Sequence, residues 1–205
     1  MSPDTLLLFT AAVFLLALSP GPDNLFVITQ ALAYGAKSGM LITLGLCTGL
    51  VVHTLLVAAG VTAMVAATPM LFDCLKWLGA IYLCTLAWQI WQVVELSPAH
   101  AKLFSSSWAM YKRGIFMNLA NPKVGLFFLA FLPQFVISPG WALSLQLLIL
   151  GGIFILVALA VFIGFSCLAG RLNQFLSAPS RFKWLNRTAA GIFVLMAIRL
   201  VVNGQ

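Results

Sequence analysis

Long apolar stretches separated by short polar segments run through the whole chain. Six of them, at about residues 5–31, 40–66, 71–94, 114–137, 141–169 and 184–202, have the length and the scarcity of charge typical of membrane-spanning helices. The longest polar stretch, residues 95–113, separates the first three spans from the last three. The pattern predicts an all-α polytopic membrane protein: one transmembrane domain over residues 1–205, made of two three-helix parts, 1–94 and 114–205, and a connecting loop, 95–113.

Two of the predicted spans are interrupted near their middle by residues that helices tolerate poorly. The first span contains Pro20, Gly21 and Pro22, and the fourth contains Pro122. Proline removes a backbone donor, and groups freed inside a membrane need partners in protein or in a water-lined cavity. We therefore expect the first and fourth helices to be broken at these residues, which would also serve as gating points.

Three spans in each half give the two halves opposite orientations in the membrane. When Pro22 is aligned with Pro122, Asp23 falls on Lys123. Secondary transporters are known with broken helices in matching positions of inverted repeats, and their substrate sites lie where the repeats meet. The sequence thus predicts a three-plus-three inverted repeat.

Composition and charge fit this interpretation. The chain is 62% hydrophobic and 7% charged, with a mean hydropathy of +1.08 and a net charge of +7. The basic side chains lie mainly in the first, third and fifth loops, so the positive-inside rule makes these loops cytoplasmic, including 95–113, and places both termini outside. We therefore expect no nucleic-acid partner. The basic loop residues are Lys37, Lys102, Lys112, Arg113, Arg171, Arg181, Lys183 and Arg187.

An acid and a base inside the spans are the first candidates for function. A charge at the centre of a bilayer costs about 2.5–3.5 kcal/mol on insertion scales, and such residues mark transport pathways. Asp23 and Lys123 each follow a proline suited to the first position of a helix, where free N–H groups favour anions. Lys123 needs an anion there, so we expect it to approach Asp23. The alternative is that Asp23 only caps a kink and Lys123 extends to the membrane surface.

Amide side chains cluster around both breaks and are predicted to line a substrate site. They are Asn24, Gln30, Asn118 and Asn121. Asp23 and Gln30 are seven positions apart and so share one helix face. Gln134, eleven positions after Lys123, is expected on the side of Lys123. The alternative for these amides is hydrogen bonding between helices.

His53 continues a G-x-x-x-G spacing formed by Gly45 and Gly49. Small residues at this spacing mark a helix-packing face, so His53 is expected to point inward. A role in proton coupling, shared with Asp23, is one interpretation. A histidine that only packs between helices is the other.

Sequence motifs for catalysis are absent. The chain has no H-E-x-x-H, no G-x-S-x-G and no Walker A sequence, and its only acids are Asp4, Asp23, Asp73 and Glu95. The four cysteines lack metal-binding spacing. We therefore predict that the protein is not an enzyme and uses no cofactor or metal, and that an ion gradient drives any pumping.

Three segments resemble the lysine/homoserine-threonine exporter family (LysE/RhtB) of prokaryotes. They are residues 18–53, which contain LSPGPDN, residues 79–91 (GAIYLCTLAWQIW) and residues 113–135, which contain LANPKVG. The similarity extends over essentially the whole chain in length and order. One departure is Asp23, because many members of the family have Asn after P-G-P.

The resemblance implies export of amino acids or close derivatives, driven by protons, across a bacterial inner membrane. It also implies six hydrophobic segments and is compatible with a homodimer. The mechanism that we hypothesise is alternating access around a site in the middle of the membrane, with an amino acid, protons and the lipid bilayer as partners. Two other classes stay open: an ion channel or ion carrier, and a membrane assembly protein that transports nothing.

Overall fold

A computed structural model describes residues 2–19, 21–67, 106–136 and 141–176, together with single residues between 77 and 92 and between 184 and 198. All regular secondary structure in this part of the chain is helical. The third and sixth predicted spans lie largely outside the described residues, as do Pro20 and residues 95–105 of the connecting loop. The six-span inverted repeat therefore stays a prediction.

The first predicted span is two helices. Helix α1 covers Pro3–Leu18 and α2 covers Pro22–Tyr34, and the two axes differ by 57°. Ser2 caps α1 by accepting a hydrogen bond from the backbone N–H of Thr5 at 3.2 Å. Helix α2 ends at Gly35, whose φ of +85° suits glycine and starts a turn into the next helix. The expected break in the first helix is confirmed.

The fourth predicted span is also broken. Helix α5 covers Ser107–Leu119 and α6 covers Pro122–Leu126, and the bend between their axes is 50°. A π-helical turn, η1 (Phe127–Phe131), and a 3-10 turn, η2 (Leu132–Phe135), continue the segment. Helix α5 begins before the predicted boundary at 114, because Ser106 caps it by accepting from the N–H of Ala109. The last residues assigned to the connecting loop are therefore helical.

The two remaining helices are long and unbroken. Helix α3 covers Ala36–Ala67 and α7 covers Leu143–Leu176. Within the described residues, these two are long and apolar enough to cross a membrane, and the number rises to four if each bent pair forms one span. Four of the six predicted spans thus correspond to helical segments of suitable character.

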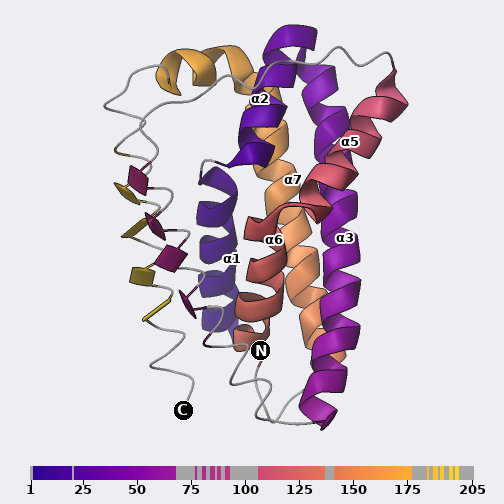
Figure 1. The fold of residues 1–205 in the computed structure, drawn as a ribbon, viewed down its shortest axis with the longest axis vertical. Helices are drawn as coiled ribbons and strands as arrows, with labels where there is room; N and C mark the ends of the chain where they lie inside the picture. Colours follow the sequence, from indigo (N-terminus) through magenta and orange to yellow (C-terminus); the bar gives the residue numbers. More distant parts are fainter. Residues whose placement is uncertain are drawn as a thin grey trace.

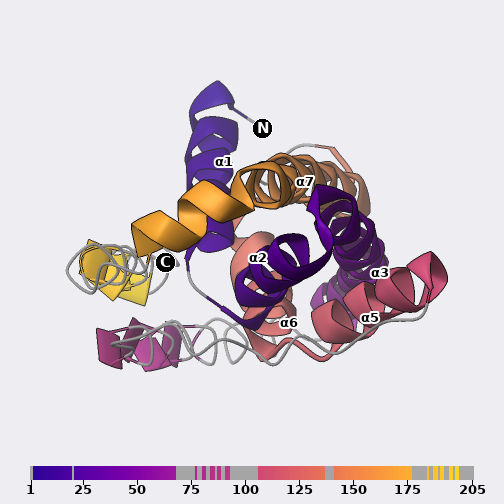
Figure 2. The same cartoon turned by 90° about the horizontal axis from the view of Figure 1, so that it is seen from above.

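The helices form a bundle in which the long helices α3 and α7 pack side by side (Figures 1 and 2). Helix α3 packs along α5 and α7, α2 lies against α3 and α7, and α1 contacts α7. The broken segments run in opposite directions, since α1 begins at the end of the molecule toward which α6 runs (Figure 1). Each break therefore falls at mid-height of the bundle, where the other break also lies.

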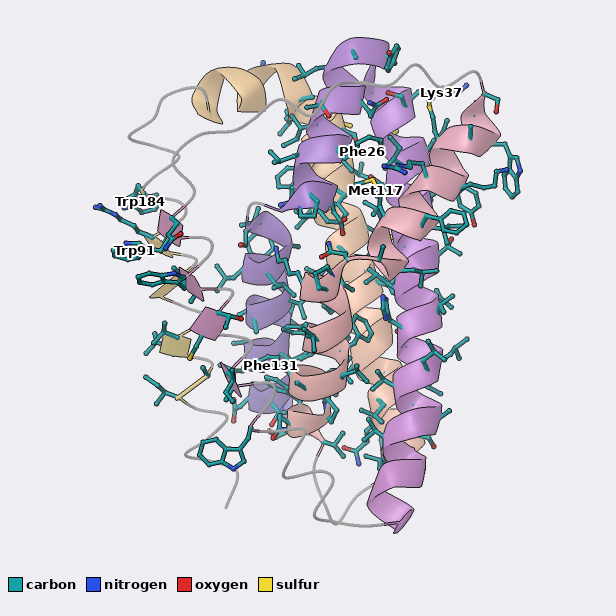
Figure 3. The ribbon with its side chains drawn as sticks, viewed as in Figure 1. Phe26, Lys37, Trp91, Met117, Phe131 and Trp184 are labelled. Atoms are coloured by element: carbon teal, nitrogen blue, oxygen red, sulfur yellow. The ribbon has the colours of Figure 1, made fainter. Side chains whose placement is uncertain are left out.

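One end of the bundle is basic. Lys37 lies at the start of α3, Lys112 and Arg113 lie midway along α5, and Arg171 lies near the end of α7; all four are exposed. The starts of α3 and α5 and the end of α7 lie toward the same end of the molecule, opposite to the start of α1 (Figures 1 and 3). The clustering fits the charge pattern of the loops, and it keeps the prediction that this end faces the cytoplasm.

Candidate functional site

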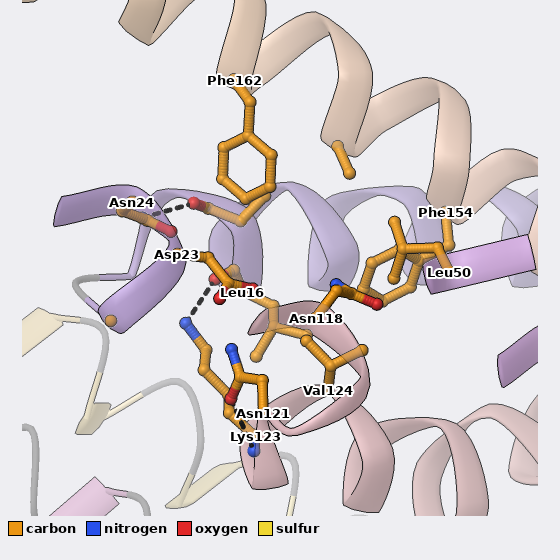
Figure 4. Close-up of a pocket in the computed structure, with 13 residues that line it drawn as sticks. Leu16, Asp23, Asn24, Leu50, Asn118, Asn121, Lys123, Val124, Phe154 and Phe162 are labelled. Atoms are coloured by element: carbon orange, nitrogen blue, oxygen red, sulfur yellow. Dashed lines mark hydrogen bonds between the residues drawn. The ribbon is translucent and has the colours of Figure 1, made fainter. Parts of the chain in front are cut away.

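The two helix breaks face one another across a small cavity (Figure 4). Its volume is about 30 Å³, which is room for only a water molecule or two. The polar residues around it come from both breaks, and five of them were predicted from the sequence. They are Asp23 and Asn24 from α2, Asn118 from α5, and Asn121 and Lys123 at the start of α6.

The local geometry at both breaks is that of a helix start. Gly21 and Asn121 are the N-cap residues of α2 and α6, and Pro22 and Pro122 occupy the first helical positions. The Asn121 side chain accepts a hydrogen bond from the backbone N–H of Lys123 at 3.0 Å. The expected helix-start arrangement is therefore confirmed at both breaks, with a side-chain cap at the second.

The ammonium of Lys123 reaches across to the end of α1. It donates to the carbonyl oxygens of Leu16 and Ser19, each at 2.9 Å, and the residue is only 9% exposed. Gly21 borders the same ammonium, since a Cβ built there would lie 3.5 Å from Nζ. The C-terminal end of a helix carries partial negative charge, which stabilises a cation. Lys123 therefore finds its direct partners in backbone carbonyls rather than in the carboxylate that we expected.

Asn24 uses the other carbonyls that the first break exposes. Its Nδ2 donates to the carbonyl oxygens of Ala17 at 2.8 Å and Ser19 at 3.0 Å. The last turn of a helix leaves carbonyls without partners inside the helix, and leaving them bare in an apolar interior costs free energy. Asn24 and Lys123 together stabilise the end of α1.

The carboxylate of Asp23 lies among donors from the second break. The side chains of Asn121 and Asn118 are its nearest polar neighbours, and Lys123 attracts it electrostatically. Asp23 is 4% exposed, and its Oδ1 atom has no hydrogen-bond partner. A buried acceptor without a partner is costly, so this oxygen is available to a ligand in the cavity.

Gln30 shares a helix face with Asp23 but does not line the cavity. It is fully buried, and neither atom of its side-chain amide has a hydrogen-bond partner. Its backbone carbonyl accepts from the Ser38 hydroxyl at 2.8 Å, which ties α2 to the start of α3. The role of Gln30 as a substrate contact stays a prediction.

His53 lies at the packing interface that the glycine spacing predicted. A Cβ on Gly45 would collide with the carbonyl oxygen of Tyr111, and one on Gly49 would lie 2.6 Å from Oδ1 of Asn118. Nε2 of His53 is 3.4 Å from the backbone oxygen of Asn118, and its ring is 5.6 Å from that of Phe128. The inward orientation is confirmed, whereas the role of His53 in proton coupling is untested.

Apolar side chains form most of the cavity wall, and the sequence analysis did not identify them. Leu16, Leu50, Val124, Phe154 and Phe162 are its large members. They come from α1, α3, α6 and α7, so nothing in their local sequence distinguishes them from other residues of the apolar stretches. Only the contacts between segments distant in the chain bring them together.

Aromatic rings in tilted and edge-to-face contact pack together on the side of the cavity away from the basic end. The ring of Phe127 lies 6.4 Å from that of Phe9, 4.8 Å from Phe131 and 5.4 Å from Phe154. Phe135 continues the layer, 5.0 Å from Phe9 (Figure 3 labels Phe131). Buried aromatic pairs at these distances contribute favourably beyond the area that they bury. In the conformation described, these buried rings therefore fill the bundle interior on this side.

Gln134 was expected on the side of Lys123, as a lining residue, but it does not border the cavity. Its Nε2 donates to the carbonyl oxygen of Ala130 at 3.3 Å. The π turn at Phe127–Phe131 accounts for the error, because i→i+5 bonding inserts an extra residue into the turn and rotates everything that follows.

Comparison with known proteins gives a consistent result. The family described as "LysE type translocator" matches residues 14–204. A "Homoserine/homoserine lactone efflux protein" of Salmonella typhimurium is 34% identical over 187 residues, covering 91% of this chain and 90% of the relative. A "Leucine efflux protein" of Enterobacter sp. is 36% identical over 130 residues, 62% of each chain. An "Uncharacterized membrane protein" of Vibrio cholerae is 33% identical over 190 residues, 91% of this chain and 90% of the relative.

No solved structure is significantly similar to this chain.

Proposed function

This chain belongs to the LysE type translocator family, and on that premise we propose that it is a secondary active exporter of amino acids or close derivatives, driven by the proton gradient. The observation that carries the proposal is a buried acid and a buried base at two facing helix breaks, around one cavity in an otherwise apolar bundle. Ionisable side chains inside a membrane are costly and rare, and they typically mark the path of a solute or an ion.

Membership in this family makes the protein a transporter rather than an enzyme. It is a multi-pass protein of the bacterial inner membrane, consistent with its long apolar helices. Its relatives named as efflux proteins carry homoserine, homoserine lactone or leucine in their names. These names support an amino acid as the transported molecule.

The two ends of an amino acid match the two charges of the site. Its carboxylate would bind Lys123 and the free N–H groups at the starts of α2 and α6, where Asn118 and Asn121 add polar contacts. Its ammonium would bind Asp23, Asn24 and the carbonyls at the end of α1. The side chain would then lie against the apolar wall.

The wall favours neutral side chains. Among the described residues, Asp23 is the only acid that borders the cavity, and the ammonium of the substrate would use it. A second positive charge on the substrate would have to be buried against Phe154, Phe162 and Leu50, at a high desolvation cost. We therefore propose a neutral amino acid as the substrate.

Transport requires a change of shape. The cavity of about 30 Å³ is too small for an amino acid, so its walls must separate for binding. Alternating access supplies this separation, first toward the basic end and then toward the opposite end. Protonation of Asp23 from outside would weaken its attraction for Lys123 and for the substrate ammonium, which would couple inward proton movement to export.

A dipeptide-feeding assay tests the proposal. Cells with and without the protein are fed dipeptides, and the free amino acids that leave the cells are measured. Faster release of one or a few neutral amino acids, abolished when the proton gradient is collapsed, is the expected result. Equal release from both cell types would reject export. Non-saturating ion flux in vesicles, unaffected by amino acids, would favour a channel instead.

A further inference from the structure

We propose that the ammonium of Lys123 and the ammonium of the substrate use the same site in turn. In the empty protein Lys123 occupies this site, and substrate binding displaces it. This inference rests on the proposed function. It adds a specific ligand site, formed by the carbonyls of Leu16 and Ser19 beside Asp23, for a primary ammonium group.

The contacts of Lys123 define the site. An ammonium has three N–H donors, and Lys123 directs hydrogen bonds at the carbonyl oxygens of Leu16 and Ser19, each at 2.9 Å. These oxygens belong to the end of α1, where the helix dipole favours a cation. Asn24 already donates to the neighbouring carbonyl of Ala17, and it shares the carbonyl of Ser19 with Lys123. An incoming ammonium therefore has to take the oxygens that Lys123 now holds.

Asp23 provides an independent reason to place a ligand here. Its side chain is 4% exposed and borders the cavity, and Oδ1 lacks a hydrogen-bond partner. A carboxylate oxygen buried in this way is the acceptor that an entering ammonium can contact before Lys123 leaves. The cavity holds little more than a water molecule, so the substrate ammonium and that of Lys123 cannot both stay between Asp23 and the α1 carbonyls.

Exchange has a consequence for selectivity. Once displaced, Lys123 is a buried cation that requires a new anion or acceptor, and the substrate carboxylate supplies it. An amine without a carboxyl group would leave the displaced Lys123 ammonium buried without an anion. A carboxylic acid without an amine would leave the α1 carbonyls without a donor. The wild-type protein should thus accept only molecules that carry both groups.

A pair of variants tests the site directly. Lys123→Ala removes three methylenes and the ammonium, a deletion that n-propylammonium matches in size, whereas Lys123→Met refills the volume without a charge. We expect n-propylammonium to raise the melting temperature of purified Lys123→Ala, with an apparent affinity about tenfold or more above that for Lys123→Met and for the wild type. Propan-1-ol, of similar size and uncharged, should have no such effect.

The inference is overturned if n-propylammonium stabilises Lys123→Ala no better than it stabilises Lys123→Met, or no better than propan-1-ol does. A second measurement needs no variant, in case Lys123→Ala does not fold. Wild-type protein should bind L-leucine at least about tenfold more tightly than 3-methylbutylamine, which lacks the carboxyl group of leucine, or 4-methylpentanoate, which lacks its amino group. Binding of the amine as tight as that of leucine would equally refute exchange.

These outcomes are separate from those of the proposed function. Export that persists while the amine tests fail would reject the exchange and leave the exporter intact. If Lys123→Ala binds the amine but the wild-type protein exports no amino acid, the ammonium site would stand and the proposed function would be rejected.

Discussion

The two helix breaks are built from the same elements but offer opposite chemistry. The first, between α1 and α2, presents acceptors: the carbonyls of Leu16 and Ser19 and the carboxylate of Asp23. The second, between α5 and α6, presents donors: the ammonium of Lys123 and the amides near Asp23. Each break thus satisfies groups that the other leaves open, and a molecule with one acid and one base can join them.

The breaks also differ in how firmly their second helices start. Asn121 caps α6 with a side-chain hydrogen bond, whereas Gly21 gives α2 no such bond. Helix α2 is also bounded at its far end by Gly35. The start of α6 therefore has a side-chain cap that the start of α2 lacks, and the second break is the better fixed at its helix start.

Lys123→Met should have the largest effect, because it removes the donor that the first break needs. The α1 carbonyls and Asp23 would then be buried without their cation, which costs about 3 kcal/mol or more. We expect export to fall to the level of cells that lack the protein, and the melting temperature to drop. Lys37→Met, at an exposed position, is the control and should change neither. Full export by Lys123→Met would contradict the interpretation that the second break supplies a donor that the first break needs.

Asp23→Asn should change the response to the gradient more than the fold. The amide keeps the shape and most hydrogen-bonding capacity of the carboxyl but cannot titrate. Export in vesicles is expected to lose its dependence on the proton gradient. Undiminished, still gradient-dependent export would assign the coupling elsewhere, with His53 as the next residue to test.

Gly49→Ala should disturb the second break through the contact between α3 and Asn118. The added Cβ would lie 2.6 Å from Oδ1 of Asn118, so the α3–α5 contact must shift, at a cost of about 1–3 kcal/mol. Gly60→Ala, in the same helix with nothing within 4 Å, is the matched control and should be neutral or slightly stabilising. Equal melting temperatures for the two variants would show that the interface is less tight than described.

Gln30→Leu should raise stability while lowering export. The buried amide has no partner in the conformation described, so an apolar side chain of similar size removes a desolvation cost of about 1 kcal/mol. If Gln30 binds substrate in an open conformation, activity falls in the same variant. A gain in stability with unchanged export would leave Gln30 without a part in transport.

Asn121→Ala and Gly21→Ala should have the smallest effects on stability, and they compare the two helix starts most directly. Loss of the Asn121 cap is expected to cost about 1 kcal/mol in the free energy of unfolding. Gly21 has an extended backbone, with φ of −166°, and room for a Cβ at ordinary contact distance, so its replacement should cost less. The reverse order in denaturant titrations would contradict the assignment of the second break as the better fixed.

Local rules predicted much of this site. The prolines located both breaks and the helix starts that follow them, and the G-x-x-x-G spacing identified the α3 face that meets α5. The partners of Lys123 could not be predicted, because backbone carbonyls are present everywhere and carry no sequence signal. The position of Gln134 could not be predicted either, since a π turn changes the helical repeat and apolar residues do not reveal it in advance.

The hydrogen bonds of Lys123 join residues 107 and 104 positions apart in the chain. They therefore connect the two halves of the bundle directly. Parting the halves without cargo would leave a cation and bare carbonyl oxygens in an apolar interior, which raises the free energy of opening in the unloaded molecule. In the proton-coupled exporter that we propose, this cost would limit the leak of protons through carriers that hold no substrate.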